Sequence, residues 1–583
     1  MDQKLSRIKY ESIIKKKIKE QKSNTLSYIR LVVFILAIIP FIVYLTTKNY
    51  LYLIIALIFF FFFIILVLIH SRVIKEIKKI NKYLEIISRY ENRLSSKWQE
   101  EYLNQEGEYA NPIIDLDIIG NNSLLKYINF TNSLGGLKKL ISALSLTNYN
   151  KKTIINNQSS IKELKDKQNF ILDFQYKLSN IDNIKEIDYS AIFNYFNPHF
   201  TENKKIYLIS LILSIITIIT AILSLFHILP IYIFLIFSLI QLAYAYFMSS
   251  RYQGEFNIID KTAREFSYLN DIYKFISNEE FTSVSNQKLQ RNIKKGQDSL
   301  DSLTKIASLN SYRLNFITYV IFNIFFSLNF LIIHRYSNLI HSKLNYLKTS
   351  ISSLEEFEKL ISFTTICFVK KQTSLPIISD SLEIETSNIK HPLLNENLCI
   401  SNNFKCLKDI NIITGSNMSG KTSFMKTIGI NLVLAYNGAY VNSSYFKFPL
   451  AKIFTSINVK DDISKGISTF YGELKRIKDI LDYSEKNTEP MIIFIDEIFK
   501  GTNYNDRILG AKETLKQLSS LNCIVFLTTH DFELCTLDNK IIKNYHFSEE
   551  YHRDKIVFDY KIKEGQCKTT NAKYLMKQMK IIK

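Results

Sequence analysis

Cysteine, glycine and proline are scarce in this sequence, and the cysteines are placed in a way that excludes two classes of protein. None of the six cysteines precedes residue 367, and none belongs to a CxxC pair. A disulfide framework or a thiolate metal site needs regularly or closely spaced cysteines, so neither is indicated. We expect reduced thiols at Cys367, Cys399, Cys406, Cys523, Cys535 and Cys567. The low glycine and proline content accompanies abundant lysine, isoleucine, asparagine and tyrosine, which indicates a compositional bias of the coding sequence.

Acidic residues are outnumbered by basic ones, and the formal net charge is +20. Such an excess suits a polyanion, either nucleic acid or an anionic lipid surface. The compositional bias explains it equally well, because lysine is abundant along the whole chain. With 583 residues and 47% hydrophobic content the chain can form several domains with large cores. The position of the apolar residues therefore decides the class of protein.

The pattern of a cleavable signal sequence is also missing, although the N-terminal region is strongly apolar. Leu31 to Leu45 and Tyr50 to Ile69 contain no charged residue, and each approaches the length of a membrane-spanning helix. A signal peptide would supply one such run followed by small residues at a cleavage site. We therefore expect a basic cytoplasmic segment over residues 1–26 and a transmembrane hairpin over residues 27–70.

A second pair of apolar runs repeats this arrangement. Ile206 to Leu225 and Ile231 to Met248 are joined by a short turn and flanked by basic residues, as the first pair is. Positively charged flanks stay in the cytoplasm. The pattern predicts a second hairpin over residues 204–249 and a multi-pass cell-membrane protein with four spans, both termini cytoplasmic and the lipid bilayer as a partner. The alternative is two helical hairpins buried in a soluble core, whose apolar faces would need cover on every side.

Mixed polar and apolar residues at helical spacing occupy the remaining parts before residue 377. They predict helical segments over residues 71–203 and 250–376. One further apolar stretch, Phe316 to Ile333, is interrupted by Asn323 and Asn329. A fifth crossing would place the phosphate-binding loop described next outside the cell, away from ATP. We therefore expect a buried core helix there.

From residue 377 onwards, short β-branched runs alternate with helices, which predicts an α/β domain over residues 377–583. The apolar run Ile410–Ile413 is followed by a glycine-bearing loop and a helix start with the spacing of a P-loop. The glycines let successive backbone N–H groups point at phosphate oxygens, assisted by the helix N-terminus. Lys421 would contact the outer phosphates and Thr422 a Mg²⁺ ion. The candidate nucleotide-binding residues are Gly415, Ser416, Asn417, Met418, Ser419, Gly420, Lys421, Thr422 and Ser423.

Two further predicted strands end in residues suited to nucleotide chemistry. Met491–Ile495 is followed by Asp496, which can hold the hydration shell of Mg²⁺, and by Glu497, which can orient or deprotonate the attacking water. Cys523–Leu527 is followed by two threonines and His530, which could reach the γ-phosphate. A single histidine at a strand end is otherwise a structural residue. The predicted catalytic residues are Lys421, Glu497 and His530, and the predicted Mg²⁺ ligands are Thr422 and Asp496.

Several segments, in this order, resemble the ATPase domain of the MutS DNA mismatch repair family. They are Ile413–Lys421, Ser468–Glu473, Asp496–Thr502 and Thr529–Leu534, preceded by His391-Pro392 where the family enters that domain. The resemblance covers roughly the last 200 residues. It implies an α/β P-loop NTPase domain of the ABC/MutS type with ATP and Mg²⁺ as cofactors. Together with the apolar runs, the expected fold is an α-helical membrane and core region followed by this domain.

The resemblance also implies a homodimer, because MutS-type ATPases close each nucleotide site with a signature segment from the partner subunit. Here that segment would be Ser464–Phe470, with Ser468 reaching the γ-phosphate in the opposing subunit. Asn417 would line the phosphate site. Tyr560–Gly565 and Thr569–Met576 resemble the segment with which the family closes its dimer.

Fainter similarity, around residues 122–140 and Ile155–Leu164, extends to the helical core of the same family. An N-terminal mismatch-reading domain with a Phe-x-Glu wedge is missing, and apolar hairpins stand in the front part of the chain. The sequence resembles membrane-associated MutS-like proteins of bacteria.

Three functions are left open at this point. The first is a membrane-anchored, dimeric MutS-like ATPase whose heads close with ATP and reopen on hydrolysis. The second is a membrane-tethered DNA-binding protein in which ATP acts mainly as a switch. No aromatic-interleaved basic patch supports DNA binding directly. The third is an ABC-like transporter, against which the few spans and the lack of intramembrane charges speak.

Overall fold

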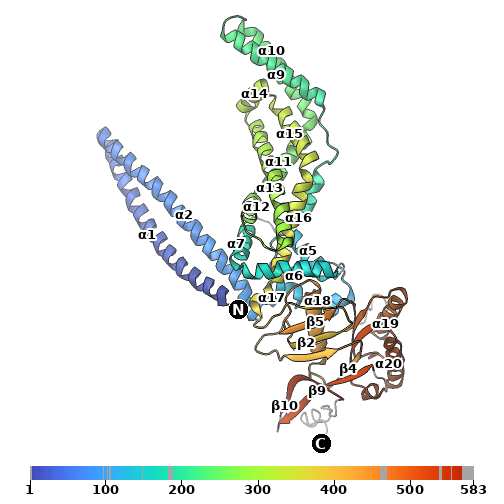
Figure 1. Ribbon diagram of the computed structural model, residues 1–583. Coiled ribbons are helices and arrows are strands. Elements are labelled where there is room, and N and C mark those ends of the chain that lie inside the picture. Colours follow the sequence, from blue (N-terminus) through green and yellow to red (C-terminus); the bar gives the residue numbers. More distant parts are fainter. Residues whose placement is uncertain are drawn as a thin grey trace. The chain divides into compact units, whose positions relative to one another are not determined.

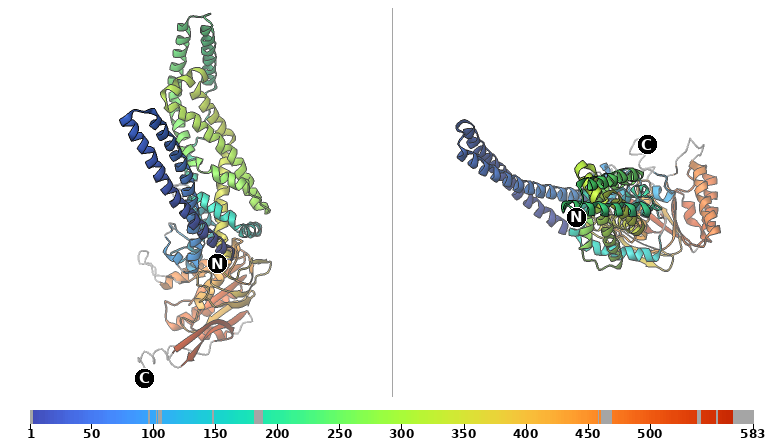
Figure 2. Two further views of the ribbon diagram at one scale, coloured as in Figure 1. Left: turned by 90° about the vertical axis from the view of Figure 1, so that its left-hand side faces the viewer. Right: turned by 90° about the horizontal axis from the view of Figure 1, so that it is seen from above.

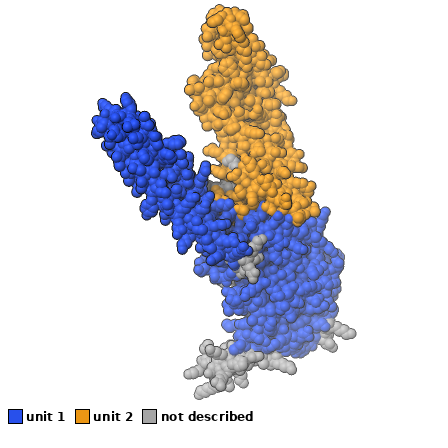
Figure 3. All heavy atoms as spheres, turned by 60° about the vertical axis from the view of Figure 1, so that its left-hand side comes forward, with its two compact units in different colours: residues 1–129, 141–172, 363–583 blue, residues 130–140, 173–362 orange. Residues whose placement is uncertain are grey.

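The computed structural model describes residues 3–95, 97–101, 103, 107–146, 149–180, 188–457, 459, 469–537, 541–552 and 555–566. The chain divides into two compact units (Figure 3). Unit 1 comprises residues 1–129, 141–172 and 363–583, and unit 2 comprises residues 130–140 and 173–362. Each unit is therefore assembled from segments that are far apart in the sequence.

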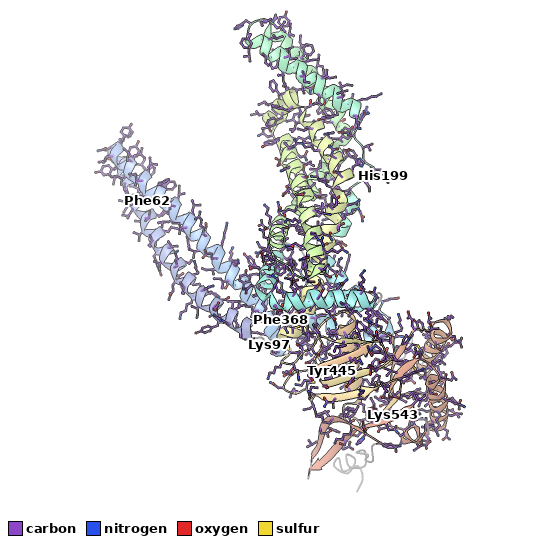
Figure 4. All side chains as sticks on the ribbon, in the orientation of Figure 1. Phe62, Lys97, His199, Phe368, Tyr445 and Lys543 are labelled. Carbon is purple, nitrogen blue, oxygen red and sulfur yellow. The ribbon has the colours of Figure 1, made fainter. Side chains whose placement is uncertain are left out.

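Unit 1 begins with a helical hairpin of α1 (Gln3–Thr47) and α2 (Tyr50–Leu94), which run side by side in both views of Figure 2. Each helix has 45 residues, which corresponds to about 68 Å at 1.5 Å per residue. The apolar runs occupy only the half nearer the loop, where Phe62 is labelled in Figure 4. The other half is charged, and Lys9 pairs across the two helices with Glu91 at 2.7 Å.

Further helices of unit 1, most of them short, lie between this hairpin and the α/β part in the sequence. They are η1 (Lys97–Glu100), α3 (Asn111–Asp115), α4 (Leu124–Ile128), α6 (Lys151–Asp166) and α17 (Thr365–Val369). Asp115 of α3 accepts hydrogen bonds from Thr455 (2.7 Å) and Arg476 (2.5 Å). Asp117 pairs with Lys426 at 2.7 Å. The segment of α3 is thus joined to the α/β part through charged and hydrogen-bonded side chains.

The α/β part contains two sheets (Figure 1). The larger has the order β10-β9-β4-β8-β7-β6 and is parallel except for the β9–β10 pair. Its strands are β4 (Ile410–Thr414), β6 (Lys452–Ser456), β7 (Met491–Asp496), β8 (Cys523–Thr528), β9 (Ile542–His552) and β10 (Lys555–Glu564). β4 and β8 are buried along their whole length, as their continuous apolar character requires. The expected α/β domain is confirmed.

Three helices belong to this part of the chain. Helix α18 (Lys421–Tyr436) follows β4, α19 (Thr469–Lys486) lies between β6 and β7, and α20 (Tyr504–Ser519) follows β7. The apolar side chains of α19 and α20 pack with those of β7 and β8 in one buried cluster. The second sheet has the order β1-β5-β2-β3. Its strands are β1 (Ile377–Ser379), β2 (Ile384–Ile389), β3 (Asn402–Cys406) and β5 (Tyr445–Pro449).

Unit 2 is helical in its described residues. Its main helices are α9 (Lys204–Leu225), α10 (Ile231–Ser249), α11 (Gln253–Ser267), α12 (Asn270–Ser277), α13 (Val284–Ser311), α14 (Phe316–Phe326), α15 (Leu328–Ser342) and α16 (Leu344–Phe363). Helices α5 (Leu134–Leu144) and α7 (Gln168–Ser179) contribute to both units, and α8 (Tyr189–Ile192) precedes α9. Among the described residues, four helices are long and apolar enough to cross a membrane: those of Leu5–Thr47, Tyr50–Leu94, Lys204–Leu225 and Ile231–Phe266.

The expectation of one buried core helix over Phe316–Ile333 is wrong. The chain forms two helices there, bent by 76° at Ser327, whose φ of 52° is left-handed. Most of α15 is buried, but α14 exposes 81% of Phe316 and 66% of Ile317. The apolar composition did not indicate this break. The break is held by hydrogen bonds between side chains that are distant in the sequence.

Candidate functional site

The loop between β4 and α18 has the backbone of a phosphate-binding loop. Gly415 has φ 148° and Gly420 has φ 106°, both unfavourable for residues with a side chain. A Cβ at Gly415 would lie 2.8 Å from Ser419 Oγ and 2.9 Å from the Phe547 carbonyl oxygen, so glycine is required there. Gly420 is the N-cap of α18, which brings the positive end of that helix to the loop.

Lys421 bends back over this loop. Its Nζ donates to the carbonyl oxygens of Gly415 and Ser416, both at 2.9 Å, and lies 3.4 Å from His530 Nε2. The side chain is buried, with 6% of its surface exposed. Carbonyl partners carry only partial charge, so the ammonium group keeps its attraction for an anion at the loop.

Thr422 and the acid at the end of β7 form an oxygen-rich group. Thr422 Oγ1 lies 3.0 Å from both carboxylate oxygens of Asp496. Thr528 Oγ1, at the end of β8, also donates to Asp496. Hydroxyl and carboxylate oxygens suit a hard cation such as Mg²⁺, which keeps several waters and takes only one or two carboxylates from the protein. These residues therefore fit Mg²⁺. In the described residues there is no larger cluster of metal-ligating side chains.

Glu497 follows Asp496 in a left-handed conformation with φ 54°, and its N–H donates to the Thr528 carbonyl oxygen at 3.0 Å. Its carboxylate lies 3.2 Å from His530 Nε2 and 2.8 Å from Lys500 Nζ. The hydrogen bond from His530, with Lys500 assisting, lowers the pKa of Glu497 to about 2 although burial opposes the shift. Glu497 is therefore ionised at neutral pH.

His530 stands between Lys421 and Glu497 and uses the same ring nitrogen toward both. A neutral imidazole nitrogen either accepts from the lysine or donates to the carboxylate, but cannot do both. The next residue, Asp531, is fixed by Arg507 through two hydrogen bonds of 2.9 and 2.8 Å. The histidine is thus placed by a rigid neighbour and can exchange partners.

The other predicted loop residues have different surroundings. Asn417 and Met418 are exposed, Met418 to 85%, and line the adjoining cavity together with Ser423. Ser416 Oγ donates to Glu549 of β9 at 2.6 Å, and Ser419 is buried beneath the loop. Ser468 and most of the predicted signature segment lie outside the described residues, as does Thr569–Met576.

A cavity of about 590 Å³ opens from the loop and has an apolar wall that the sequence analysis missed. Lys421, Thr422 and Glu497 line its polar side. Its largely apolar lining consists of Ile389, His391, Leu394, Leu398, Ile400, Phe547 and Tyr560. Burial, with Lys370 and Lys426 nearby, lowers the pKa of His391 to about 3, so this ring is neutral. An apolar wall beside a phosphate-binding loop offers a surface for a planar base.

No motif marks this wall because its residues come from separate segments. His391 and the residues up to Ile400 precede β3, whereas Phe547 and Tyr560 belong to β9 and β10. The only sequence signal was His391-Pro392, which carried no predicted role in binding.

Comparisons with known proteins agree on the C-terminal part. Residues 411–580 match the family model of MutS domain V. The chain is 32% identical over 201 residues to the DNA mismatch repair protein MutS of Aquifex pyrophilus, covering 33% of this chain and 23% of that protein. It is 32% identical over 222 residues to the same-named protein of Staphylococcus haemolyticus, covering 36% and 25%.

It is also 30% identical over 260 residues to the MutS protein homolog 4 of Mus musculus, covering 42% of this chain and 26% of that protein. The chain thus spans about a quarter of the length of these curated relatives.

Proposed function

Because this chain belongs to the MutS family, we propose that it is a membrane-anchored MutS-like ATPase. ATP closes a homodimer of ATPase domains and hydrolysis reopens it. One observation carries the proposal. The neighbouring strands β4, β8 and β7 end at the same edge of the sheet and bring Lys421, Asp496, Glu497 and His530 within hydrogen-bond reach of one another or of Thr422.

Each residue has one task in this proposal. Bound ATP and Mg²⁺ supply the reactive phosphoanhydride and the charge that activates it. Lys421 gives up its carbonyl partners for phosphate oxygens, and Thr422 with Asp496 holds the cation. Glu497 orients the attacking water and accepts its proton, while His530 turns from Glu497 toward the γ-phosphate. The apolar wall around Leu398 holds the base.

Closure of the dimer would follow from nucleotide contacts that exist only in the closed state. The family resemblance assigns the closing contact to Ser468 of the partner, which supplies a hydrogen-bond donor to the γ-phosphate. The contacts of Asp115 and Asp117 with the α/β part would transmit the closing movement of the ATPase domain to α3 in the same unit.

The membrane anchor is supported by apolar side chains that the fold leaves uncovered. In the loop-proximal half of α1 and α2, Leu57 is 59% and Phe61 63% exposed. Each such side chain would cost roughly 1.5–3 kcal/mol in water relative to burial. Lipid removes this cost. Basic residues at the outer ends of both hairpins favour a four-span arrangement with the ATPase domain in the cytoplasm.

ATP turnover of the reconstituted full chain tests the enzymatic part. Glu497→Gln removes the base with little change in shape and should lower the turnover rate by about 100-fold or more while ATP still binds. Lys421→Ala should weaken ATP binding as well. The exposed α20 residues Glu513 and Lys516 provide matched controls, Glu513→Gln and Lys516→Ala, which should keep the wild-type rate. Unchanged turnover in both site variants would contradict the proposal.

DNA binding is the second candidate function, with ATP acting mainly as a switch. The observations in its favour are the net charge of +20 and the similarity of the chain to DNA mismatch repair proteins MutS. Phosphate contacts release counterions, so affinity for duplex DNA should fall steeply between low and physiological salt. Binding of the detergent-solubilised protein to matched and mismatched duplexes shows whether DNA is a ligand and whether mismatches are preferred. No binding at low salt removes this function and leaves the ATPase proposal intact.

A further inference from the structure

Helix α14 packs against α9 and α10 within the apolar stretches of that hairpin (Figure 1). Gln241 lies in the middle of α10, and its Nε2 donates to the carbonyl oxygen of Asn323 on α14 at 3.1 Å. The rings of Phe325 and Phe234 stack with centroids 6.3 Å apart. α14 is therefore attached along the part of the hairpin that is expected to lie in lipid.

Helix α14 leaves several large apolar side chains exposed beside its contacts with the hairpin. Besides Phe316 and Ile317 at its start, it exposes 45% of Ile321 and 58% of Phe326. The hairpin against which α14 packs also exposes an apolar surface, with Leu208 of α9 59% exposed. The neighbouring members of that surface are Ile212, Ile215, Ile236 and Leu239.

The length of α14 excludes a crossing by this helix alone. It has 11 residues, or about 17 Å, whereas a bilayer core is about 30 Å thick. The segments of the chain before and after α14 also lie close to each other. Arg313, just before α14, donates from Nε to Asn329 Oδ1 of α15 at 3.0 Å. Before and after this excursion, α13 and α15 pack against each other.

A helix break inside lipid is tolerated only if its backbone groups are satisfied within the protein. At Ser327 the protein supplies partners for several backbone groups around the break. Gln241 binds the Asn323 carbonyl oxygen, one of the last four of α14. The N–H of Asn329 donates to Asn323 Oδ1 at 3.0 Å, and those of Phe330 and Leu331 donate to the Ser327 carbonyl oxygen at 3.0 Å.

The side chains that meet Ser327 itself are neutral and buried, whereas the charged Arg313 reaches the break only through Asn329. Ser327 Oγ donates to the Ser210 carbonyl oxygen at 2.8 Å and contacts Ser214 Oγ at 2.5 Å. Gln241 Nε2 reaches the hydroxyl oxygens of Ser214 and Ser327 at 3.0 and 2.9 Å. Neutral hydrogen-bonding groups of this kind hold helices together in lipid at low cost, whereas charged groups are expensive there.

We propose that α14 and the break at Ser327 form a re-entrant membrane segment. Its exposed face binds lipid acyl chains, and Gln241 fastens it to the second hairpin. This inference rests on the proposed membrane anchoring and adds a fifth membrane element without a fifth crossing. The ATPase domain thus stays on the side of the membrane where four crossings put it, although α14 is in lipid.

Photolabelling from within the bilayer tests the lipid contact. The full chain is reconstituted in phosphatidylcholine vesicles that contain a diazirine on the acyl chain, and labelled peptides are identified by mass spectrometry. Peptides of α14 should be labelled within about twofold of those of α9, because both expose similar apolar faces. The peptide of residues 284–300 in α13 is the unlabelled control.

Two results would each refute a different statement. If α9 and α10 are labelled while α14 resembles the control, α14 does not face lipid and the inference is wrong. If α9, α10 and α14 all resemble the control, the membrane anchoring itself is wrong. Cross-links between α14 of two chains would instead assign its exposed face to a second copy of the chain and would also overturn the inference.

Cysteine labelling distinguishes a re-entrant segment from a crossing. Ser311→Cys and Asn338→Cys place thiols at exposed positions before and after the segment. A membrane-impermeant maleimide, applied to sealed vesicles of one known orientation, should modify both thiols or neither, as identified in the labelled peptides. Modification of only one of the two would mean that the chain crosses the membrane between them.

The fastening by Gln241 is tested with a matched pair on α10. Gln241→Leu removes every hydrogen bond of its amide, and the amides of residues 316–331 should then exchange with solvent about tenfold faster. Ser238→Ala, one turn earlier on the same helix, removes a buried hydroxyl whose oxygen has no hydrogen-bond partner among the described residues. It should leave the exchange unchanged. Equal exchange in both variants would show that Gln241 does not fasten α14.

Discussion

The two helical hairpins are fastened to their own units by different chemistry. At the charged end of α2, the buried Arg93 donates to the Tyr127 carbonyl oxygen at 3.0 Å and pairs with Glu101. In the apolar middle of α10, the fastening residue is Gln241, which is neutral. A buried charge is tolerable where carboxylates and carbonyls surround it near water, whereas an apolar environment favours neutral donors. The position of a polar side chain along a hairpin thus decides whether it is charged or neutral.

Unit 2 also contains a buried charged residue, but at a helix start and not in its hairpin. Glu358 accepts hydrogen bonds from the N–H groups of Asn132 and Ser133, at 2.6 and 3.0 Å, just before α5. A Cβ on Gly136 would lie 2.4 Å from its carboxylate. Arg93 binds carbonyls around the end of α4, and Glu358 binds N–H groups at the start of α5. The oxygen atoms of Glu358 thus face the positive end of α5, and the guanidinium of Arg93 faces the negative end of α4.

Breaking the contacts of Arg93 should have the largest effect on stability. Arg93→Ala leaves the carboxylate of Glu101 and several carbonyl oxygens without their donor, so the free energy of unfolding should fall by about 3–5 kcal/mol. Denaturant unfolding in detergent measures this loss. Arg72→Ala, at an exposed position of the same helix, is the control and should have little effect. A loss below about 1 kcal/mol, typical of surface pairs, would mean that the hairpin is not fastened here.

Sequence reasoning was most informative where chemistry is carried by contiguous residues. The P-loop, the acid pair Asp496-Glu497 and His530 each follow an apolar run, and parallel strands bring such ends to one edge of a sheet. The apolar runs likewise indicated the helical hairpins. The helices extend far beyond residues 26 and 70, because helix formation continues through the charged flanks that topology rules treat as boundaries.

Features that depend on distant contacts could not be derived in this way. The apolar wall of the cavity joins Leu398 with Tyr560, which come together only because β10 folds back on β9. The break at Ser327 depends on Gln241, which is 86 residues away in the chain. Arg93 is one basic residue among many in its sequence context. Nothing local distinguishes it from the exposed Arg72.

Titrating Glu358 should have the next largest effect. Burial raises the pKa of Glu358 from the ordinary value of 4.5 to about 7, against the hydrogen bonds from Ser133 and Asn132. Because the folded pKa is the higher one, its contribution to stability is complete below pH 4.5 and is lost as the pH rises through 7. The loss should approach about 3 kcal/mol. Denaturant unfolding between pH 4 and 8 measures it.

The change of the unfolding free energy with pH, measured in variants, identifies the responsible residue. Glu358→Gln should flatten it, while Glu280→Gln at an exposed position of the same unit should leave it unchanged. Glu355 also has a raised pKa through burial, and Glu355→Gln should remove only a smaller part of the slope. A slope that persists unchanged in Glu358→Gln would assign it to other carboxylates.

The smallest expected effect concerns the helix caps of the two hairpins. Asn49 caps α2 through one hydrogen bond from Leu51 N (3.0 Å), whereas Asn203 caps α9 through two, from Lys205 N (3.1 Å) and Ile206 N (3.4 Å). Replacing a cap by alanine costs about 1 kcal/mol. Exchange of first-turn amides should therefore accelerate less in Asn49→Ala than in Asn203→Ala. Pro230, which precedes α10 without a side-chain cap, offers the control Pro230→Ala. If amide exchange accelerated more in Asn49→Ala than in Asn203→Ala, the prediction would be contradicted. The first hairpin would then depend more on the cap in its loop than the second hairpin does on the cap at the start of α9.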